Sequence, residues 1–220
     1  MTTFIQQPLT YRSVNRMVLK NIPKNAHRIL EVGCGGGDLG SAIKNLQDCS
    51  ITGITFNPGE AEVAESNLDH VLIADLNCID YKKLGHYDCI ICSHVLEHLY
   101  EPQEFLYALV ANCLAPNGTV VIALPNILHW KQRLNFLRGR FRYTDGGVMD
   151  RTHFRFFDWQ TAADLILNTG LKLELKCAEG VVPFSRFLGP YSLKIDQAAC
   201  SLLPGLFGWQ FVLIGKSTQG

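Results

Sequence analysis

A glycine-rich run directly after a short apolar segment constrains this chain most. Residues 29–37 are Ile-Leu-Glu-Val-Gly-Cys-Gly-Gly-Gly. The apolar segment predicts a first strand over Arg28–Val32, and glycines allow a turn with positive φ that brings the backbone close to a ligand. We therefore expect an α/β protein with a binding site at the end of its first strand.

Short β-type runs alternate with helical patterns along the rest of the chain, as in a parallel α/β sheet. Further strands are predicted over residues 50–55, 71–74, 87–93, 119–124, 171–176 and 210–216. The expected fold is a Rossmann-like sheet of seven mostly parallel strands, with helices on both faces and an antiparallel last strand. We expect one domain over residues 1–220, with a core of about 28–176 and a sheet-completing part over 177–220.

Composition narrows the classes of partner. The 220 residues have a formal net charge of zero, so no overall field favours nucleic acid or an anionic membrane. One stretch is locally basic and is either a solvated helix face or a patch that faces the substrate; it holds Lys131, Arg133, Arg138, Arg140 and Arg142. Neither a signal peptide nor a membrane span is evident in the sequence, so a cytoplasmic protein is expected. Cys89 and Cys92 should point to opposite faces of a strand and hold no metal together.

The acid before the glycines indicates which ligand binds. A carboxylate at Glu31 would repel a phosphate but would suit the cationic end of S-adenosylmethionine (SAM). Glu31-Val-Gly33-Cys34-Gly35-Gly36-Gly37 resembles the first motif of class I SAM-dependent methyltransferases, E/D-x-G-x-G-x-G. A dinucleotide-binding dehydrogenase is the rival, because residues 35–40 satisfy G-x-G-x-x-G, although in poor register with the strand end.

The resemblance implies further contacts with SAM, or with its product S-adenosylhomocysteine (SAH). The acid that usually holds the ribose is replaced by Thr55, and relatives with a similar G-I-T pattern use a side chain five residues later, here Glu60. Asp75 and Leu76 match the motif that meets the adenine. Ser93 and His94, directly after the fourth strand, should line the methionine end.

The sequence His94-Val-Leu-Glu97-His98-Leu99 contains the E-H-L signature of many class I enzymes. We expect Glu97 and His98 nearest the reacting methyl group, with His98 as the base that removes a proton from a hydroxyl acceptor. In some relatives an E-x-x-E-H spacing holds a divalent metal. Here His94 stands in place of the first acid, so no metal is expected.

The region after the fifth strand should cap the acceptor side of the pocket. Its candidate acceptor-binding residues are Asn126, His129, Arg151, His153 and Arg155, and His153 is also a candidate catalytic residue. Phe154, Phe156 and Phe157 are expected in the core. The alternative is a self-contained surface loop in which Arg151 pairs with Asp150.

The pattern L-P-N…H-W…D-R-T-H-x-R-F-F resembles methyltransferases associated with glycan synthesis and, more loosely, MetW proteins. It implies SAM-dependent methyl transfer to an oxygen or nitrogen of a small molecule or glycan precursor, by a monomer or homodimer. A MetW-like SAM-binding regulatory subunit without turnover is the alternative, and an NAD-dependent oxidoreductase the third. The sequence does not name the acceptor.

Overall fold

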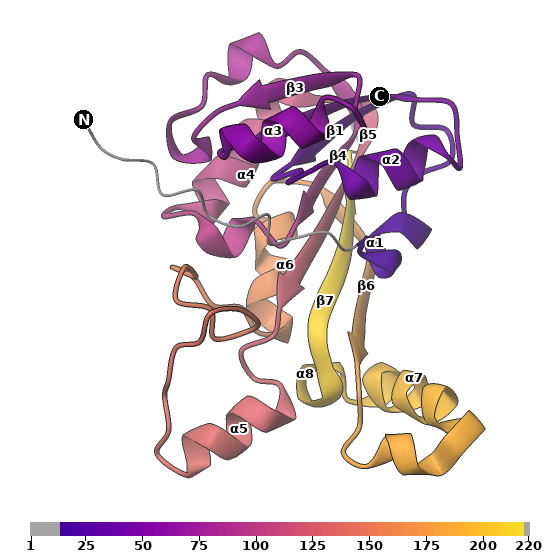
Figure 1. The fold of residues 1–220 in the computed structure, drawn as a ribbon, viewed down its shortest axis with the longest axis vertical. Coiled ribbons are helices and arrows are strands. Elements are labelled where there is room, and N and C mark those ends of the chain that lie inside the picture. Colours follow the sequence, from indigo (N-terminus) through magenta and orange to yellow (C-terminus); the bar gives the residue numbers. More distant parts are fainter. Residues whose placement is uncertain (1–13, 218–220) are drawn as a thin grey trace.

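The computed structural model describes residues 14–217, and its centre is one seven-stranded sheet in the order β3-β2-β1-β4-β5-β7-β6 (Figure 1). The strands are β1 (Arg28–Val32), β2 (Ser50–Thr55), β3 (His70–Ile73), β4 (Tyr87–Ser93), β5 (Leu114–Pro125), β6 (Lys172–Gly180) and β7 (Gly208–Lys216). Only β7 runs antiparallel to its neighbours β5 and β6. The predicted fold class is confirmed.

Helices cover both faces of this sheet. The α-helices are α1 (Arg16–Lys20), α2 (Asp38–Lys44), α3 (Pro58–Ala64), α4 (Pro102–Cys113), α5 (Trp130–Leu137), α6 (Trp159–Leu167), α7 (Ser192–Leu202) and α8 (Pro204–Phe207). Buried residues of α4 and α6 pack on one face, and those of α1, α2 and α3 pack on the other. Cys92 lies in the first of these clusters and Cys89 in the second, which confirms that they point to opposite faces.

The order of the strands creates the position for a ligand. The chain runs outward from β1 through β2 to β3 and then returns to place β4 on the other side of β1. The helices that follow β1 and β4 therefore pack on opposite faces of the sheet, and in open α/β sheets ligands bind at the carboxyl ends of the strands at such a reversal of strand order. The glycine run follows β1, and the His94–His98 segment follows β4.

Two excursions leave the sheet at the carboxyl ends of β5 and β6. The first carries α5, and the second carries the 3-10 segment η4 (Ser185–Tyr191), α7 and α8 (Figure 1). Within residues 14–217 no helix is both long and apolar enough to cross a bilayer. The sequence missed α1 and α8, because helices of five and four residues are too short to show a period.

Candidate active site at the carboxyl edge of the sheet

Backbone hydrogen bonds tie the strand ends into one continuous edge. The Cys34 N–H donates to the Ile54 carbonyl at 2.9 Å, and the Ala74 N–H donates to the Thr55 carbonyl at 3.0 Å. On the other side of β1, the His94 N–H donates to the Ala123 carbonyl at 3.0 Å. Segments far apart in the sequence therefore present their side chains at the same edge.

The glycine turn has the backbone that the sequence predicts. Gly33, Gly35 and Gly37 have φ values of +70°, +52° and +78°, in the region that side chains disfavour. A Cβ atom on Gly33 would lie 2.8 Å from Cγ2 of Val95, so the turn after β1 touches the segment after β4. Gly37 is also the N-cap of α2. Cys34 is buried between these glycines, and burial raises the pKa of its thiol to about 12.

Glu31 is a buried acid, and one of its carboxylate oxygens makes no hydrogen bond to a described residue. It is 4 % exposed, and its Oε2 has no hydrogen-bond partner in the described part of the chain. Burial raises the pKa of Glu31 to about 8, and the nearby Gly40 backbone only partly offsets this. An orphaned buried carboxylate oxygen at the glycine turn fits a ligand with a cationic group, because such a ligand supplies the missing countercharge.

The end of β2 brings together the two candidates for the ribose contact. The Thr55 hydroxyl donates to Oε2 of Glu60 at 2.8 Å, and Asn57 caps α3 so that Glu60 lies in its first turn. A carboxylate oxygen therefore occupies the place where the sequence lacks the usual acid. Asp75 is exposed, and its Oδ1 accepts from the Asn77 N–H at 2.9 Å, while Leu76 packs against the core.

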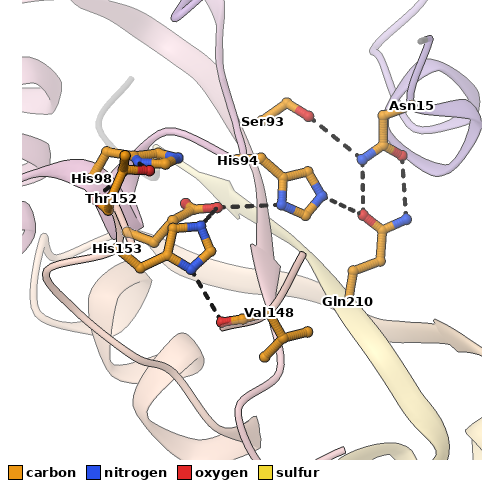
Figure 2. A network of polar contacts seen from close by, with 9 residues as sticks. Asn15, Ser93, His94, His98, Val148, Thr152, His153 and Gln210 are labelled. Atoms are coloured by element: carbon orange, nitrogen blue, oxygen red, sulfur yellow. Dashed lines mark hydrogen bonds and ion pairs between the residues drawn. The ribbon is translucent and has the colours of Figure 1, made fainter. Parts of the chain in front are cut away.

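Glu97 is the centre of a buried polar cluster after β4. Figure 2 shows the three histidines of this cluster, His94, His98 and His153. Its side chain is 1 % exposed, and its Oε1 lies 3.3 Å from Nδ1 of His94 and 4.0 Å from Nε2 of His153. The Glu97 carbonyl accepts from the backbone N–H groups of Phe154 and Arg155 at 2.9 and 3.1 Å. These two bonds hold residues 153–155 against the segment after β4, and Oε2 of Glu97 remains without a partner among the described residues.

Hydrogen bonds hold His98 through one ring nitrogen, and the other nitrogen makes no hydrogen bond within residues 14–217. Its Nδ1 lies 3.2 Å from the Thr152 carbonyl and 3.1 Å from the Thr152 hydroxyl. That hydroxyl donates to Asp150 at 2.6 Å, so it can only accept from His98. Nδ1 of His98 therefore carries a proton, and Nε2 is the nitrogen that has the lone pair when the ring is neutral.

His153 has the same arrangement. Its Nδ1 lies 3.2 Å from the Val148 carbonyl, which only accepts, so Nε2 is the unprotonated nitrogen. Burial lowers the pKa of His153, which keeps the ring neutral. The rings of His98 and His153 are 4.7 Å apart, and one ligand atom from each of Glu97, His98 and His153 lies within 4.8 Å of the others. Two bare imidazole nitrogens and a carboxylate are able to accept a proton or to ligate a divalent metal.

Three residues that the sequence analysis did not select complete this cluster. Gln210 of β7 accepts from His94 Nε2 and Asn15 Nδ2 at 2.8 and 2.9 Å, and it donates to Glu179. Asn15 also donates to the Ser93 hydroxyl at 3.4 Å. Gln210 had one available signal, since it is a buried polar residue in a strand of otherwise apolar character.

The acceptor-side candidates divide into three groups: His153, the buried pair Asn126 and His129, and the two exposed arginines. His153 belongs to the cluster around Glu97. Asn126 is fully buried, and its amide donates to the carbonyls of Gly205 and Gly208, so it anchors the chain before β7. His129 is buried, its Nε2 has no partner in residues 14–217, and burial lowers its pKa to about 4.

The two arginine candidates lie in exposed ion pairs. Arg151 pairs with Asp145 at 2.8 Å, not with Asp150, and Arg155 pairs with Glu101 at 2.8 Å. The expectation for the phenylalanines is correct only for Phe157, because Phe154 is 51 % exposed and Phe156 is half-buried. The Phe154 N–H donates to the Glu97 carbonyl, and with its backbone held there the Phe154 side chain faces outward and packs on Tyr100.

Ubiquinone biosynthesis O-methyltransferases are among the curated relatives with detectable sequence similarity. The chain is 35 % identical over 103 residues to the mitochondrial ubiquinone biosynthesis O-methyltransferase of Schizosaccharomyces pombe, a match that covers 44 % of this chain and 37 % of that protein. It is 26 % identical over 192 residues to the ubiquinone biosynthesis O-methyltransferase of Chromobacterium violaceum, covering 80 % and 76 % of the two chains.

Solved structures share the fold at low identity. A SAM-dependent methyltransferase from Archaeoglobus fulgidus aligns with a TM-score of 0.63 and 20 % identity, over 88 % of this chain and 87 % of that one. The [4+2]-cyclase SpnF aligns with a TM-score of 0.60 and 16 % identity, over 93 % and 80 %.

A family model described as a methyltransferase domain matches residues 4–176. Its span includes the glycine turn, the Glu97–His98 segment and His153. The chain therefore belongs to the methyltransferase domain family, and its sheet is the one on which SAM-dependent methyltransferases are built.

Proposed function

We propose that this protein transfers the methyl group of SAM to a hydroxyl group of a small molecule. The observation that carries the proposal is that His98 and His153, beside the buried Glu97, are each held through Nδ1, so that Nε2 is the nitrogen left to accept a proton. A hydroxyl acceptor must lose its proton as it attacks, whereas a neutral amine attacks with a lone pair that it already has. The names of the relatives, ubiquinone biosynthesis O-methyltransferases, favour the same chemistry.

In this proposal the edge of β1 and β2 holds SAM, which supplies an activated methyl group. Glu31 provides the negative charge for its cationic end, and the glycines of the turn let the backbone approach it. Thr55 and Glu60 together take the ribose, and Asp75 with Leu76 takes the adenine. Ser93 and His94, between β4 and the catalytic cluster, line the methionine end.

The catalytic roles follow from the hydrogen bonds of the cluster. His98 is the general base, since its Nδ1–H is occupied by Thr152 and its Nε2 is free to accept the acceptor's proton. The carboxylate of Glu97 stabilises the imidazolium that forms. His153, held by Val148, orients the acceptor hydroxyl or takes the proton in place of His98.

A divalent cation is the alternative occupant of the same cluster, since Glu97, His98 and His153 offer three ligand atoms. In that case the metal would orient the acceptor oxygen and lower its pKa. We propose the metal-free mechanism, because His94 replaces the first acid of the E-x-x-E-H spacing that would hold a metal.

Acceptor class is tested by measuring SAH formation with three matched panels: phenols and catechols, primary amines, and sugar hydroxyls. We expect turnover with the hydroxyl compounds and none with the amines. Turnover restricted to amines would contradict the proposal. SAH binding without turnover in any panel, combined with stimulation of a second enzyme, would support the regulatory-subunit alternative instead.

A further inference from the structure

Exposed apolar side chains are concentrated at one end of this molecule. Of the 22 large hydrophobic side chains that are exposed in the described chain, 13 lie in residues 134–143 and 181–203, which together comprise 33 residues. Exposed apolar residues on a monomeric protein are normally scattered, and a contiguous concentration marks an interaction surface.

The second excursion from the sheet, residues 181–207, carries the larger share, and we call it the aromatic arm. Phe184 is 79 % exposed, Phe187 is 86 % exposed and Leu202 is 80 % exposed. Helix α7 lies within this arm and buries only Cys200. A helix with one buried residue has most of its surface available to something outside the chain.

Residues 130–143, in the first excursion, combine apolar exposure with positive charge, and we call them the basic arm. Leu137 is 84 % exposed and Phe141 is 56 % exposed. Five basic residues and no acid occur in this stretch, in a chain whose net charge is zero. All five are exposed, and none forms a salt bridge with a described residue; they are Lys131, Arg133, Arg138, Arg140 and Arg142.

Hydrogen bonds join the bases of the two arms. The indole N–H of Trp130 donates to the Val181 carbonyl at 3.0 Å, and Arg133 donates to the Gly205 carbonyl at 3.2 Å. Both arms project beyond the same end of the sheet, where α5, α7 and α8 are drawn at the bottom of Figure 1. The exposed apolar side chains of the two arms and the basic residues therefore lie at the same end of the molecule.

We infer that the two arms dock this protein on the surface of an anionic lipid bilayer. Arg138, Arg140 and Arg142 of the basic arm complement lipid phosphates, and the exposed phenylalanines and leucines of both arms enter the interfacial layer. A purely apolar partner would leave the basic charge unexplained. Since the arms begin where β5 and β6 end, docking would place the acceptor side of the site next to the lipid. The inference does not depend on the proposed reaction.

The test is co-sedimentation of the full chain with two kinds of vesicle, phosphatidylcholine alone and phosphatidylcholine with phosphatidylglycerol. We expect binding to the anionic vesicles, weakened by salt. The triple substitution R138Q/R140Q/R142Q should weaken it about tenfold or more. The pair F184S/F187S should also weaken it, while retaining the wild-type melting temperature because both side chains are exposed.

Matched controls lie elsewhere on the surface. Leu46→Ser removes a side chain that is 70 % exposed, and K82Q/K83Q removes two exposed charges from the 3-10 segment Tyr81–Lys83; both variants should bind vesicles like the wild type. Absence of binding to anionic vesicles, or equal losses in the arm and control variants, would overturn the inference. So would a wild-type dimer that F184S/F187S converts to a monomer, because a second copy would then be the occupant.

Discussion

Nε2 of His94 lies 2.8 Å from Oε1 of Gln210, and this contact connects the end of β4 to the last strand of the sheet. Gln210 turns its oxygen toward His94 because its amide nitrogen donates to the carboxylate of Glu179. The other ring nitrogen of His94 faces Glu97. Both nitrogens thus meet acceptors, and although burial opposes the charge, the bonds to Glu97 and Gln210 raise the pKa of His94.

Replacing Gln210 by Leu should lower the pKa of His94, because the ring loses one of its two acceptors. We expect an NMR titration of the imidazole to show this shift. The free energy of unfolding should fall by about 1–3 kcal/mol, since buried partners are left unsatisfied. Gln103→Leu, on α4, is the control: it removes an amide that donates to the Leu165 carbonyl and should leave the titration of His94 unchanged. An unchanged titration in Q210L would show that the contact does not set the charge of His94.

Replacing His98 by Gln should slow methyl transfer about 10²- to 10⁴-fold while SAH affinity changes little, because the substitution removes the base and leaves the cofactor edge intact. Single-turnover kinetics and calorimetry separate the two quantities. Arg151→Gln removes an exposed ion pair and serves as the control for an ordinary surface change. Equal losses in rate and in SAH affinity would assign His98 to the cofactor site instead.

The raised pKa of Glu31 makes SAH binding dependent on pH. With a pKa of about 8, the carboxyl group is protonated in the free protein at pH 7, and the ammonium group of bound SAH favours its ionised form. SAH binding at pH 7 should therefore release protons, whereas binding above pH 9 should not. Calorimetry in buffers with different ionisation enthalpies measures this release.

The raised pKa of Glu31 also determines the direction in which the stability of the protein changes with pH. A folded-state pKa above the ordinary value of 4.5 means that the folded protein binds more protons than the unfolded one between pH 4.5 and about 8. Glu31 should therefore make the free protein less stable as pH rises through that window. Glu31→Gln should remove this contribution and the proton release. Persistent proton release in that variant would assign the proton to another group.

Gly33 and Gly139 form a natural pair for testing the glycine turn. Their φ values are +70° and +68°, but a Cβ on Gly33 would meet Val95 at 2.8 Å, whereas a Cβ on Gly139 would meet no atom within 4 Å. In both Gly→Ala variants the left-handed backbone should lower the free energy of unfolding by about 1–2 kcal/mol. Gly33→Ala should lower it further, and this variant alone should also bind SAH more weakly. Equal effects would show that contact with Val95 is unimportant.

Removal of metal distinguishes the two mechanisms at the catalytic cluster. We expect enzyme dialysed against a chelator to retain its rate, because Nδ1 of each imidazole is held by a hydrogen bond that leaves Nε2 to accept a proton, and because His94 replaces the first acid of the metal-binding spacing. Loss of activity that Zn²⁺ or Mn²⁺ restores would favour a metal held by Glu97, His98 and His153. Glu97→Gln then provides a second readout, because it would weaken binding of the metal itself.

The sequence alone determined the features that depend on local patterns. Apolar runs and glycines located six of the seven strands within a few residues, since burial on both faces of a parallel sheet leaves a continuous apolar signal. The fifth strand was placed too short, because Asn117-Gly118 indicates a turn although Leu114 still pairs with Tyr87. Motif order along the chain also predicted Glu31, the glycines, Thr55 and Glu60 at one edge, because successive parallel strands end there.

Only the tertiary structure decided which of the remaining polar residues meet. His153 lies 4.0 Å from Glu97, although 55 other residues separate them, because the Glu97 carbonyl binds the backbone that follows His153. Gln210 reaches His94 because β7 pairs antiparallel with β5, which brings its first residues to the carboxyl edge. By contrast, Arg151 and Arg155, close neighbours of His153 in sequence, point to solvent. Residues that are neighbours in one loop can point in different directions. Which of them enter the site depends on where tertiary contacts place the loop backbone.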